Sequence, residues 1–142
     1  MRCAGPKDCW AVGYYTGRRA YLNQALHWNG SRWSKVRTPN PAGTTSARVN
    51  ELFDVTCLSA SACWAVGEDG SQGMAMVARN EVLRWNGHAW SSVRVPQPAG
   101  STSPDFNFLN GIRCSSASRC LAAGVGDKGG VPRTLRTAGT WG

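Results

Sequence analysis

The feature that most constrains this fold is a pair of cysteines with five residues between them, which occurs three times along the chain. The sequence around the second pair matches that around the third at an offset of 57, and that around the first at an offset of 54. The stretch Cys-Trp-Ala-Val-Gly stands at 9–13 and again at 63–67. Self-similarity at such a period predicts a stack of small, duplicated units. The pairs are Cys3/Cys9, Cys57/Cys63 and Cys114/Cys120.

A second repeated block follows the first two cysteine pairs, at 26–43 and 83–100. Each copy contains Trp-Asn-Gly-x-x-Trp, and Asn-Gly between apolar segments is the strongest short signal for a two-residue β-hairpin. Each copy then reaches Pro-x-Pro-Ala-Gly, which ends a strand because proline cannot donate to a ladder. Every unit therefore reads as four strands, which in the second copy are Leu52–Cys57, Cys63–Glu68, a strand ending at Trp85, and Ala89–Val95.

These units predict an all-β fold, a partial β-propeller of about two and a half four-stranded antiparallel blades with a disulfide in each hairpin. The strand Cys-Trp-Ala-Val-Gly is apolar at consecutive positions, which indicates cover on both faces, as between neighbouring blades. We expect one repeat domain, 1–142, with a partial first blade at 1–50, a second at 51–107 and a truncated third at 108–142. A β-trefoil is the alternative, but units of 54–57 residues and an incomplete third copy favour the propeller.

Each cysteine pair brackets the turn between the first two strands of its unit, where residues on paired strands lie within disulfide reach. A zinc site is the rival, but the chain has no Cys-x-x-Cys and neither histidine is near a cysteine in sequence. Disulfides predict an oxidising, extracellular compartment. Because Met1-Arg2-Cys3 opens the chain without an apolar h-region, we expect a longer precursor or a leader outside this sequence.

The pairing of Cys-Trp-Ala-Val-Gly with Trp-Asn-Gly-x-x-Trp, and the Ser-Ala-Ser between cysteines, resembles a repeat found in secreted actinobacterial proteins. That resemblance implies a propeller of the kelch and galactose-oxidase type and an extracellular setting, and it implies no activity. The chain departs from the kelch pattern because Gly-Gly occurs only once, at Gly129-Gly130.

The net charge of +8 comes from 13 arginines and three lysines against eight acids. Such a chain can attract carbohydrate polyanions or an anionic cell surface. The arginines are scattered and form no nucleic-acid motif, so nucleic acid is an unlikely partner. No apolar run is long enough to span a membrane. Because a partial propeller leaves blade faces bare, the expected partners are copies of the chain or missing blades of a longer one.

No catalytic, cofactor or metal site is expected. Glu68-Asp69 is the only adjacent acidic pair, and neighbouring strand residues point to opposite faces, so we interpret the acids as solvated loop residues. His27 and His88 occupy different repeat positions and lie outside any nucleophile motif, which is typical of surface histidines. Repeat-matched tryptophans are expected to pack between blades, most strongly Trp10 and Trp64.

The segments between strands two and three differ most between copies, at Tyr15–Ala25, Asp69–Val82 and Gly126–Thr134, and we expect them to be loops. Because loops on a fixed scaffold often bind ligands, the ligand-binding candidates are Tyr14, Tyr15, Arg18, Arg19 and Tyr21. The predicted function is a non-catalytic extracellular binding or scaffold module, with glycan or cell wall as ligand. The alternatives are a fragment of a glycosidase-type propeller whose catalytic residues lie elsewhere, and a structural spacer or gene remnant.

Overall fold

The computed structural model describes residues 1–17, 19–73, 76–100, 102, 105–128 and 131–139, and none of these residues lies in a helix. The all-β fold is therefore confirmed. The strands, in chain order, are β1 (Arg2–Gly5), β2 (Asp8–Gly17), β3 (Ala20–Trp28), β4 (Trp33–Val36), β5 (Arg48–Ser59), β6 (Ala62–Ser71), β7 (Val77–Trp85), β8 (Trp90–Ser92), β9 (Phe106–Ser116), β10 (Arg119–Lys128) and β11 (Val131–Gly139).

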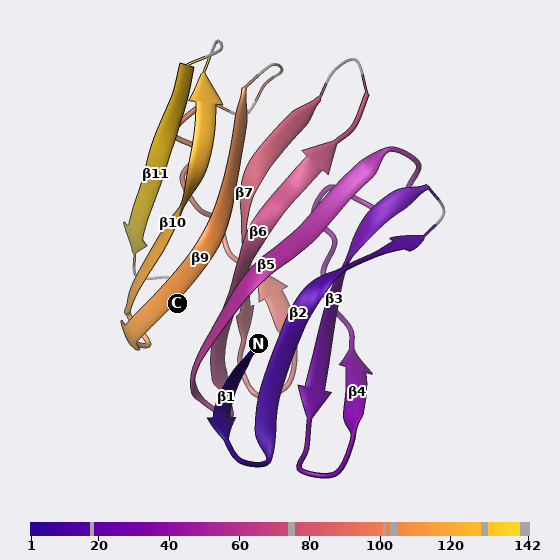
Figure 1. Ribbon diagram of the computed structural model, residues 1–142, viewed down its shortest axis with the longest axis vertical. Helices are drawn as coiled ribbons and strands as arrows, with labels where there is room; N and C mark the ends of the chain where they lie inside the picture. Colours follow the sequence, from indigo (N-terminus) through magenta and orange to yellow (C-terminus); the bar gives the residue numbers. More distant parts are fainter. Residues whose placement is uncertain (18, 74–75, 101, 103–104, 129–130, 140–142) are drawn as a thin grey trace.

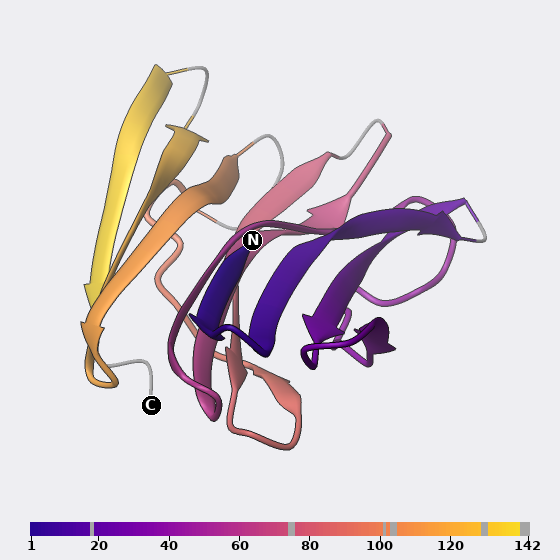
Figure 2. The same ribbon diagram turned by 60° about the horizontal axis from the view of Figure 1, so that its bottom comes forward.

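The strands form two sheets that curve around one another (Figure 1, Figure 2). The four-stranded sheet has the order β1-β2-β3-β4. The seven-stranded sheet contains β5 to β8 and β9 to β11 as two antiparallel groups. A single parallel bridge, Ala78 with Phe106, joins these groups. The repeat is thus present as three consecutive units, β1–β4, β5–β8 and β9–β11, of which the second and third share one sheet.

Each predicted cysteine pair forms a disulfide between the first two strands of its unit, and the bonds join Cys3 to Cys9, Cys57 to Cys63 and Cys114 to Cys120. In every case the two cysteines are direct partners in the strand register, with Cα atoms 3.8, 4.1 and 4.0 Å apart. A one-residue bulge adjoins each pair, at Ala4, Leu58 and Ser115. The same corner is therefore built three times, as duplication of one small sheet requires.

A second bulge explains why strand two keeps a glycine. In β5 the extra residue is Phe53, and it pushes the backbone toward Gly67, where a Cβ would lie 1.8 Å from the Glu51 carbonyl oxygen. In β9 the extra residue is Asn110, and a Cβ on Gly124 would lie 1.9 Å from the Phe108 carbonyl oxygen. Only glycine tolerates such close backbone approach.

The hydrophobic core has two parts, one between each pair of consecutive units, and the two are built from the same repeat positions. Trp10, Ala25, Leu52, Val55 and Ala65 in the first have Trp64, Val82, Leu109, Ile112 and Ala122 as counterparts in the second. Within strand two, Cys63 and Ala65 belong to the first core, whereas Trp64 and Val66 belong to the second. The apolar run is thus buried on both faces, as its composition predicts.

The cysteine pairs bracket the turn between the first two strands, as the sequence predicts, and the strand-two cysteine of each pair is also a buried residue. Cys9, Cys63 and Cys120 are 8%, 0% and 4% exposed, and Cys120 packs in the second core. Strand two is the inner strand of its sheet, so these cysteines have strand one on one side and strand three on the other. Their bonded partners on strand one are more exposed, at Cys3, Cys57 and Cys114. Each disulfide therefore ties the first strand of its unit to the buried second strand, and its cysteines have a structural role.

Buried asparagines hold the Pro-x-Pro-Ala-Gly connections, and sequence reasoning missed them. Asn50 Oδ1 accepts a hydrogen bond from the Ala42 amide at 2.9 Å, and its Nδ2 donates to the Gly43 carbonyl at 3.0 Å. Asn107 makes the equivalent bonds to Ala99 and Gly100. A second matched pair, Asn23 and Asn80, donates through Nδ2 to the carbonyls of Pro39 and Pro96. These bonds satisfy polar backbone that the connection would otherwise leave unpaired at the core edge.

The loops expected between strands two and three are largely strand, so that expectation is wrong. β2 continues to Gly17 and β3 begins at Ala20, while β6 and β7 pair as far as Ser71 with Val77. In the third unit the pairing reaches Lys128 with Val131. The ladder continues even through the Asp69-Gly70 dipeptide, because both residues pair with β7 and no proline interrupts strand two. Strand four is conversely shorter than expected, at Trp33–Val36 and Trp90–Ser92.

Replacing Gly67 by alanine should destabilise the protein by about 2–3 kcal/mol, because the methyl group overlaps the Glu51 carbonyl and the bulged strand must move. The matched control is Gly13→Ala, since no described atom lies within 4 Å of the Cβ position at Gly13. Urea unfolding followed by tryptophan fluorescence measures both. Equal losses for the two variants would show that close backbone approach is not the reason for the glycine.

Candidate functional site

The structure separates the residues that the sequence proposed as ligand contacts. Tyr14 and Tyr21 face one another on paired strands, with ring centroids 5.5 Å apart. Tyr15 lies on the opposite face of β2, where its ring lies under Lys35, with the Nζ atom 3.8 Å from the centroid. Arg19 has a φ of 63° at the hairpin tip, and its carbonyl accepts a hydrogen bond from the Ala47 amide at 3.0 Å. Arg18 lies outside the described residues.

Of these candidates, Tyr15 alone lines a cleft of about 730 Å³ between the first two units. One wall is β4 with the connection after it, and the other is the end of the β7–β8 hairpin in the second unit. The cleft therefore lies between the first and second units, and residues of both units line it. Its lining residues are Tyr15, Asn23, Lys35, Val36, Arg37, Thr38, Pro39, Asn40, Thr44, His88, Ala89 and Trp90.

The lining of this cleft, which we call the basic cleft, contains Lys35, Arg37 and His88 but no carboxylate. Lys35 rests on Tyr15, and this cation–π contact fixes a long side chain that would otherwise lose entropy on binding. Hydroxyl and amide groups of Thr38, Thr44 and Asn40 complete the lining. A cavity with a fixed lysine, a further basic side chain, an aromatic ring and hydrogen-bonding groups suits an anionic, hydroxylated ligand.

Asn23 connects the floor of the basic cleft to a buried acid. Its Nδ2 donates to Glu81 Oε1 at 2.6 Å, and its amide donates to Asn40 Oδ1 at 2.8 Å. Glu81 is 2% exposed, and among the described groups its Oε2 has no hydrogen-bond partner. Burial raises the pKa of Glu81 well above its ordinary value, and the Asn23 hydrogen bond opposes that shift. Glu81 therefore packs between the first and second units and accepts a hydrogen bond across their junction.

The acids near Glu68 are not solvated loop residues, so that interpretation is wrong. Asp69 is buried and accepts a hydrogen bond from Arg79 Nε at 3.0 Å. Glu68 faces Glu51 across the β5–β6 pair, and both line a smaller pocket of about 260 Å³. Glu68 therefore shares a face of the sheet with Glu51, its partner on the neighbouring strand, and not with Asp69, the next residue in the chain. This follows because the segment expected to be a loop is a strand, in which consecutive side chains alternate between faces.

The environment of Glu68 raises its pKa from 4.5 to about 7. Desolvation by burial is the largest cause, followed by the charges of Glu51 and Asp69. Burial also raises the pKa of Glu51. The sequence does contain a signal for this cluster, because Glu51 and Glu81 stand where Phe108 and Gln24 stand at the repeat offset of 57. The acids therefore distinguish the second unit from its copies.

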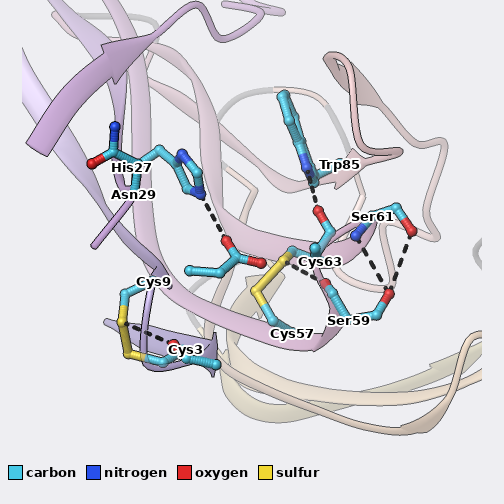
Figure 3. A network of polar contacts seen from close by, with 12 residues as sticks. Cys3, Cys9, His27, Asn29, Cys57, Ser59, Ser61, Cys63 and Trp85 are labelled. Carbon is cyan, nitrogen blue, oxygen red and sulfur yellow. Dashed lines mark hydrogen bonds and ion pairs between the residues drawn. A yellow bond between two sulfur atoms is a disulfide. The ribbon is translucent and has the colours of Figure 1, made fainter. Parts of the chain in front are cut away.

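His27 is half-buried near the end of β3 and has an acidic partner, which the sequence did not predict. Its Nε2 is 2.7 Å from Asp8 Oδ1 (Figure 3). Its ring lies 4.6 Å from that of Trp10. Ser34 is its register partner on β4, and among the described contacts no side-chain hydrogen bond joins Ser34 to His27. The His27–Asp8 pair lies beside the first disulfide, since Asp8 precedes Cys9 in β2. We interpret the pair as a packing contact at the end of the sheet and not as part of a nucleophile triad.

The packing role expected for Trp10 and Trp64 is confirmed, since they are 1% and 0% exposed. Trp85 and Trp90 contact Trp10 from the second unit, with ring centroids 4.7 and 5.1 Å away. The indole of Trp85 also donates to the Ala60 carbonyl at 3.0 Å, beside the second disulfide (Figure 3). The Trp-Asn-Gly hairpin of the second unit therefore packs against the first unit. Because Trp85 and Trp90 contact Trp10, these ring faces are not available to stack on a sugar.

No family model, curated protein or solved structure matches the chain. Within the described ranges, no helix has the length and apolar character needed to cross a membrane. The same residues contain no group of three or more His, Cys, Asp or Glu side chains arranged to hold a metal ion.

The raised pKa of Glu68 has a consequence for stability. The folded state holds a proton up to about pH 7 that the unfolded chain releases near pH 4.5, so this group makes the free energy of unfolding fall as pH rises between those values. Glu68→Gln should remove that part of the slope, as measured by urea unfolding at several pH values. Gln72→Ala, a neutral change in the same pocket, should keep it. An unchanged slope in Glu68→Gln would contradict the assignment.

Proposed function

We propose that the protein is a non-catalytic extracellular binding module whose basic cleft takes an anionic glycan, such as a uronic-acid or phosphate-bearing cell-wall polymer. The observation that carries the proposal is the composition of the cleft, with Lys35 held over Tyr15, Arg37 and His88 nearby, and no acid in the lining. The net charge of +8 supports it, because it raises the local concentration of polyanions.

The extracellular part of the proposal rests on the three disulfides, which are consistent with an oxidising compartment. The resemblance to secreted actinobacterial repeat proteins of kelch-like type points the same way. Binding requires no catalytic group, and the cleft arises from the rigid meeting of two units, so the ligand would find a site that is already formed.

We also propose that the three units are blades of a β-propeller, about two and a half of which the chain supplies. Support comes from the two equivalent cores between consecutive units. Trp90 is 5% exposed against the first unit, whereas its repeat counterpart Trp33 is 42% exposed on the outer face of β1–β4. The outer face of β1–β4 thus presents the same kind of apolar residue that the second unit buries against the first. We therefore expect copies of the chain, or further blades, to pack on this face.

Removing Lys35 and Arg37 from the lining tests the glycan proposal. Lys35→Ala combined with Arg37→Ala should raise the Kd for polygalacturonate at least about tenfold, because each charge contributes about 1 kcal/mol and the two together exceed the roughly 1.4 kcal/mol that a tenfold change requires. Isothermal titration at low salt measures this, with neutral dextran as the uncharged comparison.

The matched control is Arg94→Ala. Arg94 stands at the repeat position of Arg37 but does not line the cleft. If the control weakened binding as much as the double variant, attraction would come from net charge and not from the cleft. If the unmodified protein bound no polyanion, the binding function would be wrong and a structural spacer would be favoured.

A second candidate is a glycosidase-type activity, favoured by Glu51 and Glu68 on one face of a pocket, with the pKa of Glu68 raised to about 7. Retaining glycosidases use two close carboxyl groups, one kept protonated as a general acid. On this alternative, chromogenic glycosides should be hydrolysed and Glu68→Gln should reduce the rate at least about 100-fold. Absence of turnover on a broad glycoside panel leaves the binding module as the function.

A further inference from the structure

The backbone of strand three is held at the same repeat position in the first two units, at Asn23 and at Asn80. In the second unit a single side chain binds both polar groups of the Asn80 backbone. Gln97 Oε1 accepts a hydrogen bond from the Asn80 amide at 2.7 Å, and Gln97 Nε2 donates to the Asn80 carbonyl at 3.0 Å. Both ends of the Gln97 side-chain amide are therefore engaged with the backbone.

In the first unit two side chains divide this task. Asn40 Oδ1 accepts a hydrogen bond from the Asn23 amide at 2.8 Å, and Thr38 Oγ1 donates to the Asn23 carbonyl at 3.0 Å. Thr38 and Asn40 stand where Val95 and Gln97 stand at the repeat offset of 57. The hydroxyl of Thr38 replaces the donor that Gln97 supplies, so the backbone stays paired with a shorter side chain at Asn40. Among the described contacts, Asn40 Nδ2 donates no hydrogen bond.

The unused amino group of Asn40 belongs to the lining of the basic cleft, and its orientation is restricted. The side-chain amide is planar, and the bond from Asn23 to Oδ1 anchors one end of it. The backbone at Asn40 is anchored too, because its carbonyl accepts a hydrogen bond from the Gly43 amide at 2.8 Å. A donor held in this way can bind a ligand with little loss of side-chain entropy.

The charged part of the basic cleft differs from the second unit as well. Tyr15 and Lys35, which form the cation–π contact, stand where Asp69 and Ser92 stand in the second unit. The cation and the unused amide of Asn40 thus occur together in the first unit, and the matching positions of the second unit have neither. Both groups donate hydrogen bonds and accept none, so together they select a ligand group that is rich in acceptors.

We propose that Asn40 is a specificity-determining residue of the basic cleft, whose Nδ2 donates to the anionic group of a ligand that Lys35 attracts. This inference rests on the proposed function and narrows its ligand. The anionic group needs at least two acceptor oxygens, as in the carboxylate of a sugar acid or in a phosphate ester, because the cleft offers it an amide donor besides the cations.

Thr38→Val combined with Asn40→Gln tests the proposal, because it gives the first unit the arrangement of the second and leaves the net charge unchanged. The Kd for polygalacturonate should rise at least about tenfold, since a hydrogen bond to a charged group is lost. Isothermal titration at low salt measures this. The dependence of Kd on salt should stay that of the unmodified protein, whereas Lys35→Ala should weaken it, because only the lysine variant removes a charge.

The matched control is the reverse exchange in the second unit, Val95→Thr combined with Gln97→Asn. Neither residue lines the basic cleft, so the control should leave the Kd unchanged. Urea unfolding shows whether each variant is folded. If the first-unit variant does not fold, Asn40→Asp provides the same test, because it keeps the acceptor for the Asn23 amide and replaces the donor by an oxygen.

Inorganic polyphosphate, titrated in parallel, identifies the anionic group. A rise in Kd for polygalacturonate alone assigns a carboxylate to Asn40, and a rise for polyphosphate alone assigns a phosphate. An unchanged Kd for both, or an equal rise in the control, would overturn the role of Asn40 and leave the basic cleft as the binding site. If the unmodified protein binds neither polymer, the proposed function is wrong and this inference with it.

Discussion

The structure depends on burying a strand on both of its faces between consecutive units. Cys63 and Ala65 contact the unit before, and Trp64 and Val66 contact the unit after. Burial of a tryptophan and its neighbours contributes several kcal/mol, which a single four-stranded sheet could not obtain alone. The disulfides fix the corner from which this strand emerges, so the register that places Trp64 on one face and Ala65 on the other is set at its start.

Packing units at an angle has two polar consequences. The connection from one unit to the next crosses the edge of the core, and Asn50 and Asn107 pair with its backbone at the same place in each copy. The junction of the first two units also buries Glu81 against Asn23 and opens the basic cleft beside them. The recess proposed for ligand binding and the buried acid thus result from the same packing that stabilises the fold.

Sequence reasoning reached the repeat, the strand-forming segments, the disulfide pairs and the burial of Trp10 and Trp64, because each depends on local pattern or on matched position. It failed for the segments after strand two, where long hairpins replaced the expected loops. Tyr14 and Tyr15 were grouped by adjacency, but strand alternation places them on opposite faces of β2. The lining of the basic cleft, which includes Lys35, Arg37 and His88, could not be predicted because distant segments form it.

The sequence by itself determined which cysteines pair, where the Asn-Gly hairpins turn and that the units are all-β, since these follow from residues a few positions apart. The tertiary structure alone decided that Glu51 faces Glu68, that Asn23 reaches Glu81 and that Gly67 lies against the Glu51 carbonyl. The physical reason is register: which side chains meet across strands depends on one-residue bulges and on the contact between units, and neither is encoded by a local pattern.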